Sequence, residues 1–155
     1  MRGVAPSAYG GVCPKELDTM NVLEDGNTLT LDFGKLAKVA ARCPDVIPVA
    51  VQNADTLEVI LVAYTNEKAM RITLETRTLV LWSTSRNELW EKGKTSGETF
   101  ELVEARVNCE QNSLLYLVRP RRGGICHTKN ANGMPRNCYY RRIAGDGKAL
   151  VNIDP

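Results

Sequence analysis

The sequence predicts a small single domain of the α+β class, mostly antiparallel β-sheet with one or two helices. The chain has 155 residues, which is the size of one ordinary domain. Hydrophobic residues make up 43% of it and charged residues 25%, close to the globular average. Short β-rich runs separated by polar turns predominate, and two stretches have helical periodicity.

The two predicted helices span residues 31–41 and 66–77. The first places apolar side chains at helical spacing and ends before Pro44, because proline disfavours helical conformation in the residue before it. The second carries an apolar face of the same kind, and Thr65 or Asn66 is a suitable N-cap.

β-branched and apolar runs predict the strands. The first two flank the polar residues 53–56 and form a hairpin, and the tight polar turn 110–113 joins two later strands. Residues 84–99 are polar and contain glycine, and residues 120–137 form a long loop of a length that is usually functional or disordered. The predicted strands are 47–52, 57–64, 79–83, 100–109, 114–119 and 139–143.

These elements divide the chain into an N-terminal extension (1–30), a folded domain (31–143) and a C-terminal tail (144–155). Up to about Gly26 the extension contains prolines and glycines without periodicity, which predicts loose order. Cys13 lies there and is not expected to be a ligand, and Cys43 is expected to be a small buried hydrophobic residue.

Charge and targeting signals narrow the class of function. A net charge of +2 is too small to indicate nucleic-acid binding. The sequence shows neither a signal peptide nor an apolar run of membrane-spanning length, so we expect a cytoplasmic protein with no membrane partner. In that reducing compartment its five cysteines are candidates for metal binding or burial rather than disulfides.

Three cysteines gather in the last third of the chain: Cys109, Cys126 and Cys138, with the single histidine, His127, beside the middle one. Three thiolates are a zinc-like ligand set, and a fourth position left to water makes such a site catalytic. The spacing lacks the CxxC pairs of a zinc finger or ribbon, so three buried or incidental thiols remain the alternative. A neighbouring histidine favours zinc, because it can act as an acid or base near neutral pH.

The polar run 83–97 is a second candidate site. It combines hydroxyls, cations and two glycines, which are the ingredients of a phosphate site, although a solvated polar loop has a similar composition.

The motifs WSTSRNELWEKGKTSG, VQNADTLEVILVAYTNEKAM, CHT and CYYR, together with Cys109, resemble the phosphoribosyl-AMP cyclohydrolase family of histidine biosynthesis. The resemblance runs from about Leu31 to Arg142. It implies zinc-dependent hydrolytic opening of the N1–C6 bond of the adenine ring of a nucleotide substrate. It also implies a homodimer, with zinc held by Cys109, Cys126 and Cys138 at the interface and His127 near the reacting ring. The implied substrate- or phosphate-binding residues are Ser85, Arg86, Lys92, Thr95, Ser96 and Gly97.

Three departures from the family pattern are visible. The family has the motif DCDGD, whose aspartates bind magnesium. At the same place this chain has Asn108, Cys109, Glu110, Gln111 and Asn112. Only one carboxylate remains, so Asn108, Glu110 and Asn112 would form a weaker magnesium site. A lysine follows CHT in place of the usual glycine, and the interval between the second and third cysteines grows from seven residues to twelve. A longer loop can still return its cysteine to zinc, because closure penalties grow slowly with length.

The lost aspartates keep other functions open. The first alternative is a related zinc cyclohydrolase or hydrolase acting on another purine-like nucleotide. A non-catalytic zinc-stabilised binding module and an inactive family member are the others. A purely structural site closes its fourth zinc position with a protein ligand, so the retained histidine and polar loop argue against the binding module.

Overall fold

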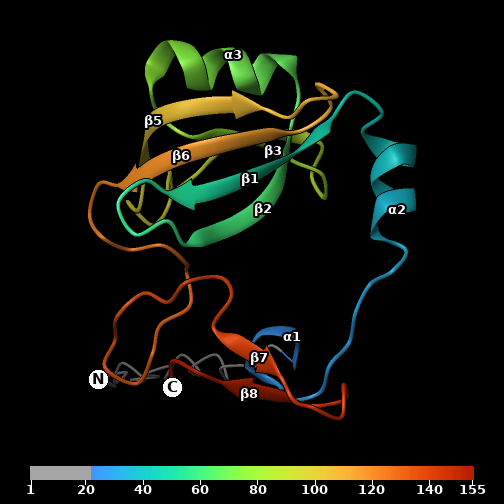
Figure 1. Ribbon diagram of the computed structural model, residues 1–155, viewed down its shortest axis with the longest axis vertical. Coiled ribbons are helices and arrows are strands. Elements are labelled where there is room, and N and C mark those ends of the chain that lie inside the picture. Colours follow the sequence, from blue (N-terminus) through green and yellow to red (C-terminus); the bar gives the residue numbers. More distant parts are fainter. Residues whose placement is uncertain (1–21) are drawn as a thin grey trace, which may run out of the picture.

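A six-stranded sheet with a helix across it forms one part of the molecule, and a two-stranded hairpin with a short helix forms the other (Figure 1). The computed structural model describes residues 22–155. The first 21 residues of the predicted extension, which include Cys13, lie outside the described residues. The helices are α1 (Val22–Asp25), α2 (Lys35–Arg42) and α3 (Glu67–Thr76). The strands are β1 (Ile47–Asn53), β2 (Val59–Thr65), β3 (Val80–Ser83), β4 (Glu88–Glu91), β5 (Phe100–Val107), β6 (Leu114–Pro120), β7 (Arg141–Ile143) and β8 (Leu150–Asn152).

The large sheet has the strand order β4-β3-β2-β1-β6-β5, and β7 pairs with β8. β1 and β6 run parallel, whereas the other neighbours in the large sheet are antiparallel. The α+β class is confirmed, and the sheet is mostly antiparallel as predicted, with one parallel pair that makes it mixed. Hydrogen bonds from Leu79 N to Phe100 O (3.0 Å) and from Leu102 N to Arg77 O (2.9 Å) bring β5 beside the residues before β3. The sheet therefore curls round on itself.

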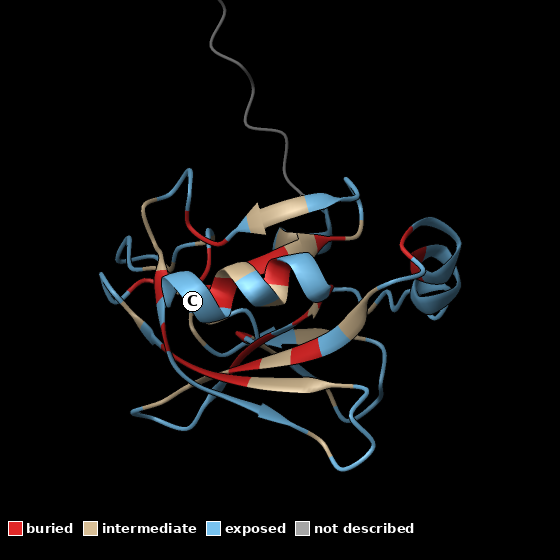
Figure 2. Cartoon of the chain, turned by 90° about the horizontal axis from the view of Figure 1, so that it is seen from above, coloured by how far each residue is buried: buried red, intermediate tan, exposed pale blue. Residues whose placement is uncertain are grey.

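Helix α3 lies across this curled sheet and packs on β2, β3 and β5 (Figure 1). Asn66, one of the two residues predicted as candidates, is its N-cap, and the Asn66 side chain accepts a hydrogen bond from Ala69 N at 3.0 Å. Seen from above, buried residues of α3 face the sheet, whereas α2 stands at the side with most of its surface exposed (Figure 2). Beneath α3 the core is fully buried, and it includes Val49, Val51, Ile60, Leu81, Phe100, Leu102, Tyr116 and Val118.

Two strands, one short helix and one helix boundary differ from the sequence-based expectation. The short helix α1 forms inside the stretch that was expected to be loosely ordered. β4 forms inside the polar run 84–99, because Asn87 adopts φ 56° and turns the chain back along β3. β8 forms in the tail by pairing with β7. The first long helix begins at Lys35, four residues later than predicted. Within residues 22–155 every helix is too short or too polar to cross a bilayer.

Thr73 joins α3 to the sheet through two buried hydrogen bonds. Its hydroxyl donates to Val80 O at 2.8 Å and accepts from Val80 N at 2.9 Å. We expect Thr73→Val to lower the free energy of unfolding by about 1–3 kcal/mol, because both backbone groups of Val80 lose a partner in a buried place. Urea denaturation measures the effect. The matched control is Thr76→Val, whose hydroxyl is exposed on the same helix and should change stability by less than about 0.5 kcal/mol; equal effects would contradict this account.

Candidate functional site

The polar segment after β4 is shaped by glycines. Gly93 has φ 85°, and a Cβ on it would lie 2.1 Å from Glu98 O, so only glycine fits there. Gly97 has φ 78° and donates from its N to Gly93 O at 2.7 Å. A Cβ on Gly97 would lie 2.7 Å from Arg122 Nη1. This tight turn brings the polar residues 92–97 to one wall of a cleft.

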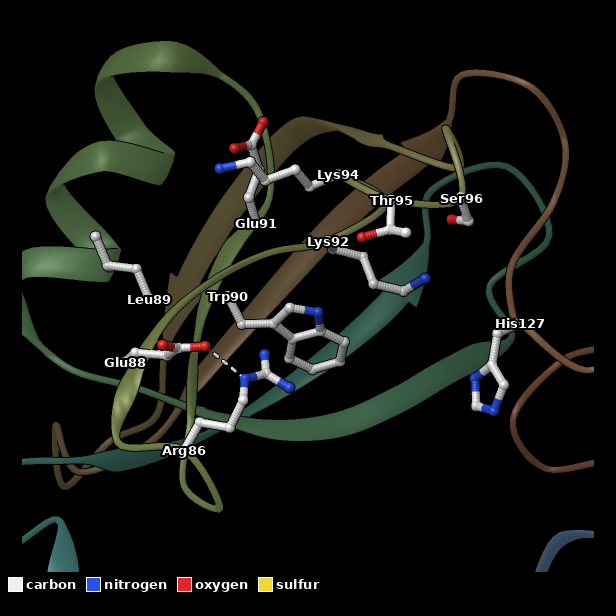
Figure 3. A pocket seen from close by; sticks show the side chains of 11 residues that line it. Arg86, Glu88, Leu89, Trp90, Glu91, Lys92, Lys94, Thr95, Ser96 and His127 are labelled. Atoms are coloured by element: carbon white, nitrogen blue, oxygen red, sulfur yellow. Dashed lines mark hydrogen bonds and ion pairs between the residues drawn. The ribbon is translucent and has the colours of Figure 1, made fainter. Parts of the chain in front are cut away.

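The cleft has a volume of about 600 Å³ and opens between this segment and the loop after β6 (Figure 3). The structure brings five of the residues predicted from sequence together along it: Arg86, Lys92, Thr95, Ser96 and His127. Two do not line it. Ser85 lies in a neighbouring groove against α2, and Gly97 shapes the turn behind the cleft.

Trp90 and Lys94 also line the cleft and were not among the predicted site residues. Trp90 lies on β4 in the middle of the view, with Arg86 beside it (Figure 3). A partial signal was present in the sequence, because the adjacent apolar residues Leu89 and Trp90 interrupt the polar run and tryptophan favours strands. The cleft therefore offers a flat aromatic surface between cationic side chains.

Lys92 is turned toward the loop after β6 and is only 8% exposed. Its Nζ donates to Ile125 O at 2.9 Å and lies 5.0 Å from the centre of the Phe100 ring. Burial lowers the pKa of Lys92, while the nearby thiols of Cys138 and Cys126 oppose that shift. Lys92 therefore ties β4 to the backbone immediately before Cys126.

Cys126 and Cys138 lie together beside Lys92. Cys126 is buried, accepts a hydrogen bond from the Thr128 hydroxyl at 3.3 Å, and is held by Cys126 N donating to Arg136 O at 2.8 Å. Cys138 is exposed as a residue, yet its thiol is desolvated. That desolvation and the neighbouring Cys126 raise the pKa of Cys138 to about 12. Two adjacent soft donors fit a zinc ion, which would displace their protons on binding.

Cys109 does not join this pair within one chain. It is exposed in the turn between β5 and β6, whereas the loop to Cys126 leaves the other end of β6. A seven-residue strand spans roughly 20 Å at about 3.3 Å per residue. Across residues 22–155, no three His, Cys, Asp or Glu side chains lie close enough to hold a metal ion. The predicted three-cysteine set is therefore incomplete in a single copy.

The predicted magnesium residues form a closed hydrogen-bonded turn. Asn108 Oδ1 accepts from Asn112 N at 3.0 Å and from Ser113 N at 2.9 Å. Asn108 Nδ2 donates to Asn112 Oδ1 at 2.8 Å, and Asn112 Nδ2 donates to Glu110 Oε2 at 2.9 Å. Amide hydrogens thus occupy oxygens that a cation would need, and a single carboxylate is present. These residues do not fit magnesium, which prefers carboxylate and water oxygens.

His127 lies at one end of the cleft (Figure 3). It is the residue directly after Cys126. Its Nδ1 is 3.8 Å from Cys126 Sγ, and its Nε2 is 2.9 Å from Glu24 Oε1. Glu24 belongs to the predicted extension, where nothing in the sequence marked a functional residue. The histidine is thus placed between the cysteine pair and a carboxylate from the other end of the chain.

The sequence of this chain is similar to those of one family of known proteins. The family model described as phosphoribosyl-AMP cyclohydrolase matches residues 61–140. A phosphoribosyl-AMP cyclohydrolase of Archaeoglobus fulgidus is 46% identical over 101 residues, which cover 65% of this chain and 88% of the relative. One from Caulobacter vibrioides is 48% identical over 99 residues, which cover 63% of this chain and 68% of the relative. One from Haloarcula marismortui is 40% identical over 111 residues, which cover 72% of this chain and 88% of the relative.

The amide turn predicts that magnesium does not bind at residues 108–112. Adding magnesium at constant ionic strength should leave the melting temperature unchanged. The double variant Asn108→Asp, Asn112→Asp should gain a saturable rise with magnesium, at about 2–4 °C per kcal/mol of binding stabilisation. Differential scanning calorimetry measures both. Saturable stabilisation of the wild-type chain by magnesium that Glu110→Gln abolishes would contradict the prediction.

Proposed function

Because the chain belongs to the phosphoribosyl-AMP cyclohydrolase family, we propose that it hydrolyses phosphoribosyl-AMP in histidine biosynthesis, using zinc shared between two copies. The observation that carries this proposal is a single cleft that joins the basic, glycine-shaped segment, Trp90 and His127 beside the Cys126–Cys138 pair.

The lining of the cleft suits a phosphorylated purine. Arg86 offers a planar fork of donors and Lys94 a point charge for phosphate oxygens, with the hydroxyls of Thr95 and Ser96 beside them. Trp90 offers a flat face on which a purine can stack, as bases stack on aromatic side chains elsewhere. Arg86 is also paired with Glu88, so phosphate would compete with this carboxylate for the guanidinium.

Zinc would be held by Cys126 and Cys138 of one copy and by Cys109 of a second. The length of β6 supports this arrangement, because the strand separates Cys109 from Cys126 and Cys138 within one chain. Apolar surface is available for the second copy: Phe33 is 92% exposed and Leu36 on α2 is 69% exposed. A bound zinc ion lowers the pKa of a coordinated water toward about 7 and so supplies a nucleophile at neutral pH.

The residues of the chain would bind the nucleotide and move protons during the reaction. Water oxygen forms a bond to C6 while the C6–N1 bond breaks, so C6 becomes a carboxamide carbon. Of the two water hydrogens, one ends on N1 and the other on the exocyclic nitrogen. His127 is placed to carry a proton at its ring nitrogen between these positions, because it lines the cleft next to the metal-binding pair.

The turn at residues 108–112 favours one second candidate. A chain whose family aspartates are replaced by amides could act on another purine-like nucleotide with the same zinc chemistry. Assaying related N1-substituted and unsubstituted purine nucleotides separates the two functions.

The proposal predicts that protein of known zinc content opens the ring of phosphoribosyl-AMP without added magnesium, as measured by the absorbance change. Cys126→Ser should lose zinc and lower activity by at least about 100-fold, because the nucleophile depends on the metal. The control is Cys43→Ser, which keeps an O–H donor to Asn87 Oδ1 and should retain zinc and activity. A zinc-replete wild-type protein that leaves phosphoribosyl-AMP intact would contradict the primary function.

A further inference from the structure

Glu24 reaches His127 from a part of the chain that precedes the residues matched by the family model, 61–140. The two residues are 103 positions apart in sequence, yet Glu24 Oε1 lies 2.9 Å from His127 Nε2. On the premise of the proposed function, we propose that Glu24 is a positioning residue that holds the His127 ring in one orientation and one tautomer for the reaction.

The backbone around Glu24 is fixed by the CYYR motif. The Tyr140 hydroxyl donates to Glu24 O at 2.6 Å. The Arg141 guanidinium donates to Leu23 O at 2.8 Å and to Gly26 O at 3.1 Å, and it lies over the Tyr140 ring at 5.1 Å. These bonds engage carbonyl groups at the end of α1. Two residues just beyond Cys138 therefore hold the segment that supplies the carboxylate.

The residues that follow α1 are held by the β7–β8 hairpin. Leu150 N donates to Asn27 O at 2.7 Å, and Leu29 N donates to Lys148 O at 2.8 Å. The segment thus runs beside β8, and α1 sits against the hairpin in the lower part of the molecule (Figure 1). The backbone is therefore held by hydrogen bonds both before and after Glu24, so the position of its carboxylate relative to the imidazole is fixed.

The chemistry of the contact sets the tautomer. A carboxylate accepts hydrogen bonds and cannot donate, so the ring nitrogen that faces Glu24 carries the hydrogen. Nδ1 is then the nitrogen with a free lone pair in the neutral ring, and it faces the Cys126 side at 3.8 Å. The His127 side chain is 70% exposed, so without Glu24 the ring would sample several rotamers. Glu24 therefore presents Nδ1 toward the metal-binding pair.

Steady-state kinetics on zinc-loaded protein test the positioning role. Glu24→Ala should lower kcat by about 10- to 100-fold, the size of effect found for residues that orient side chains at metal sites, with KM changed less than about twofold. Glu24→Gln keeps an oxygen acceptor and should recover part of kcat. Tyr140→Phe, which removes the hydroxyl bond to Glu24 O, should give a smaller loss of kcat. Glu75→Gln on α3 is the control and should match wild type.

Two further readouts separate positioning from a general structural effect. In a His127→Ala background, Glu24→Ala should cause no further loss of kcat, because it acts through the imidazole. The chain contains one histidine, so a long-range ¹H–¹⁵N spectrum of protein without a histidine tag reports His127 alone. We expect one form protonated at Nε2 in wild type, and averaged tautomers in Glu24→Ala.

Unchanged kcat and an unchanged imidazole spectrum in Glu24→Ala would overturn the inference while leaving the proposed function standing. Equal, additive losses in the wild-type and His127→Ala backgrounds would also overturn it. Wild-type protein that does not open phosphoribosyl-AMP would instead contradict the proposed function, and the spectra would still test the contact.

Discussion

Strand β6 sets the geometry on which the rest of the site depends. It is a rigid, hydrogen-bonded strand of seven residues between β1 and β5. Cys109 lies in the turn before it, and Cys126 lies in the loop after it. A paired strand cannot fold back on itself, and in this structure the two thiols lie beyond its opposite ends. In the proposed site a metal ion bound by all three cysteines would take Cys109 from a second chain, and the exposed apolar side chains Phe33 and Leu36 would give that chain a surface to cover.

Lys92 connects the two halves of the candidate site. Its buried ammonium donates a hydrogen bond to Ile125 O, the carbonyl before Cys126. The residues that follow Lys92 in the sequence form one wall of the cleft. A buried cation beside two thiols is favourable once the thiols ionise, because opposite charges attract strongly where water is excluded. Metal binding and substrate binding would thus share one structural element, with Lys92 on the metal side and Arg86 and Lys94 on the nucleotide side.

Much of the fold could be predicted from the sequence, because its signals are local. Asn66 is a strong N-cap, and residues 53–56 form the predicted hairpin turn. The parallel pairing of β1 with β6 could not be predicted, since it depends on contacts between residues more than 60 positions apart. β4 was missed because its pairing with β3 depends on a turn at Asn87 in the left-handed region, which the composition of the polar run does not reveal. Glu24 could not be predicted either, because its position depends on contacts with Tyr140 and Arg141 near the other end of the chain.

The central claim is that the metal site is completed by Cys109 of a second copy, and mixed dimers test it most directly. Cys109→Ser and Cys126→Ser proteins should each lack activity, but unfolding and refolding them together should restore it. Random pairing makes half of the dimers mixed, and each mixed dimer has one intact site of two, so about a quarter of wild-type activity and zinc should return. No recovery in dimers shown to be mixed would mean that Cys109 serves its own chain or no metal, and would contradict the claim.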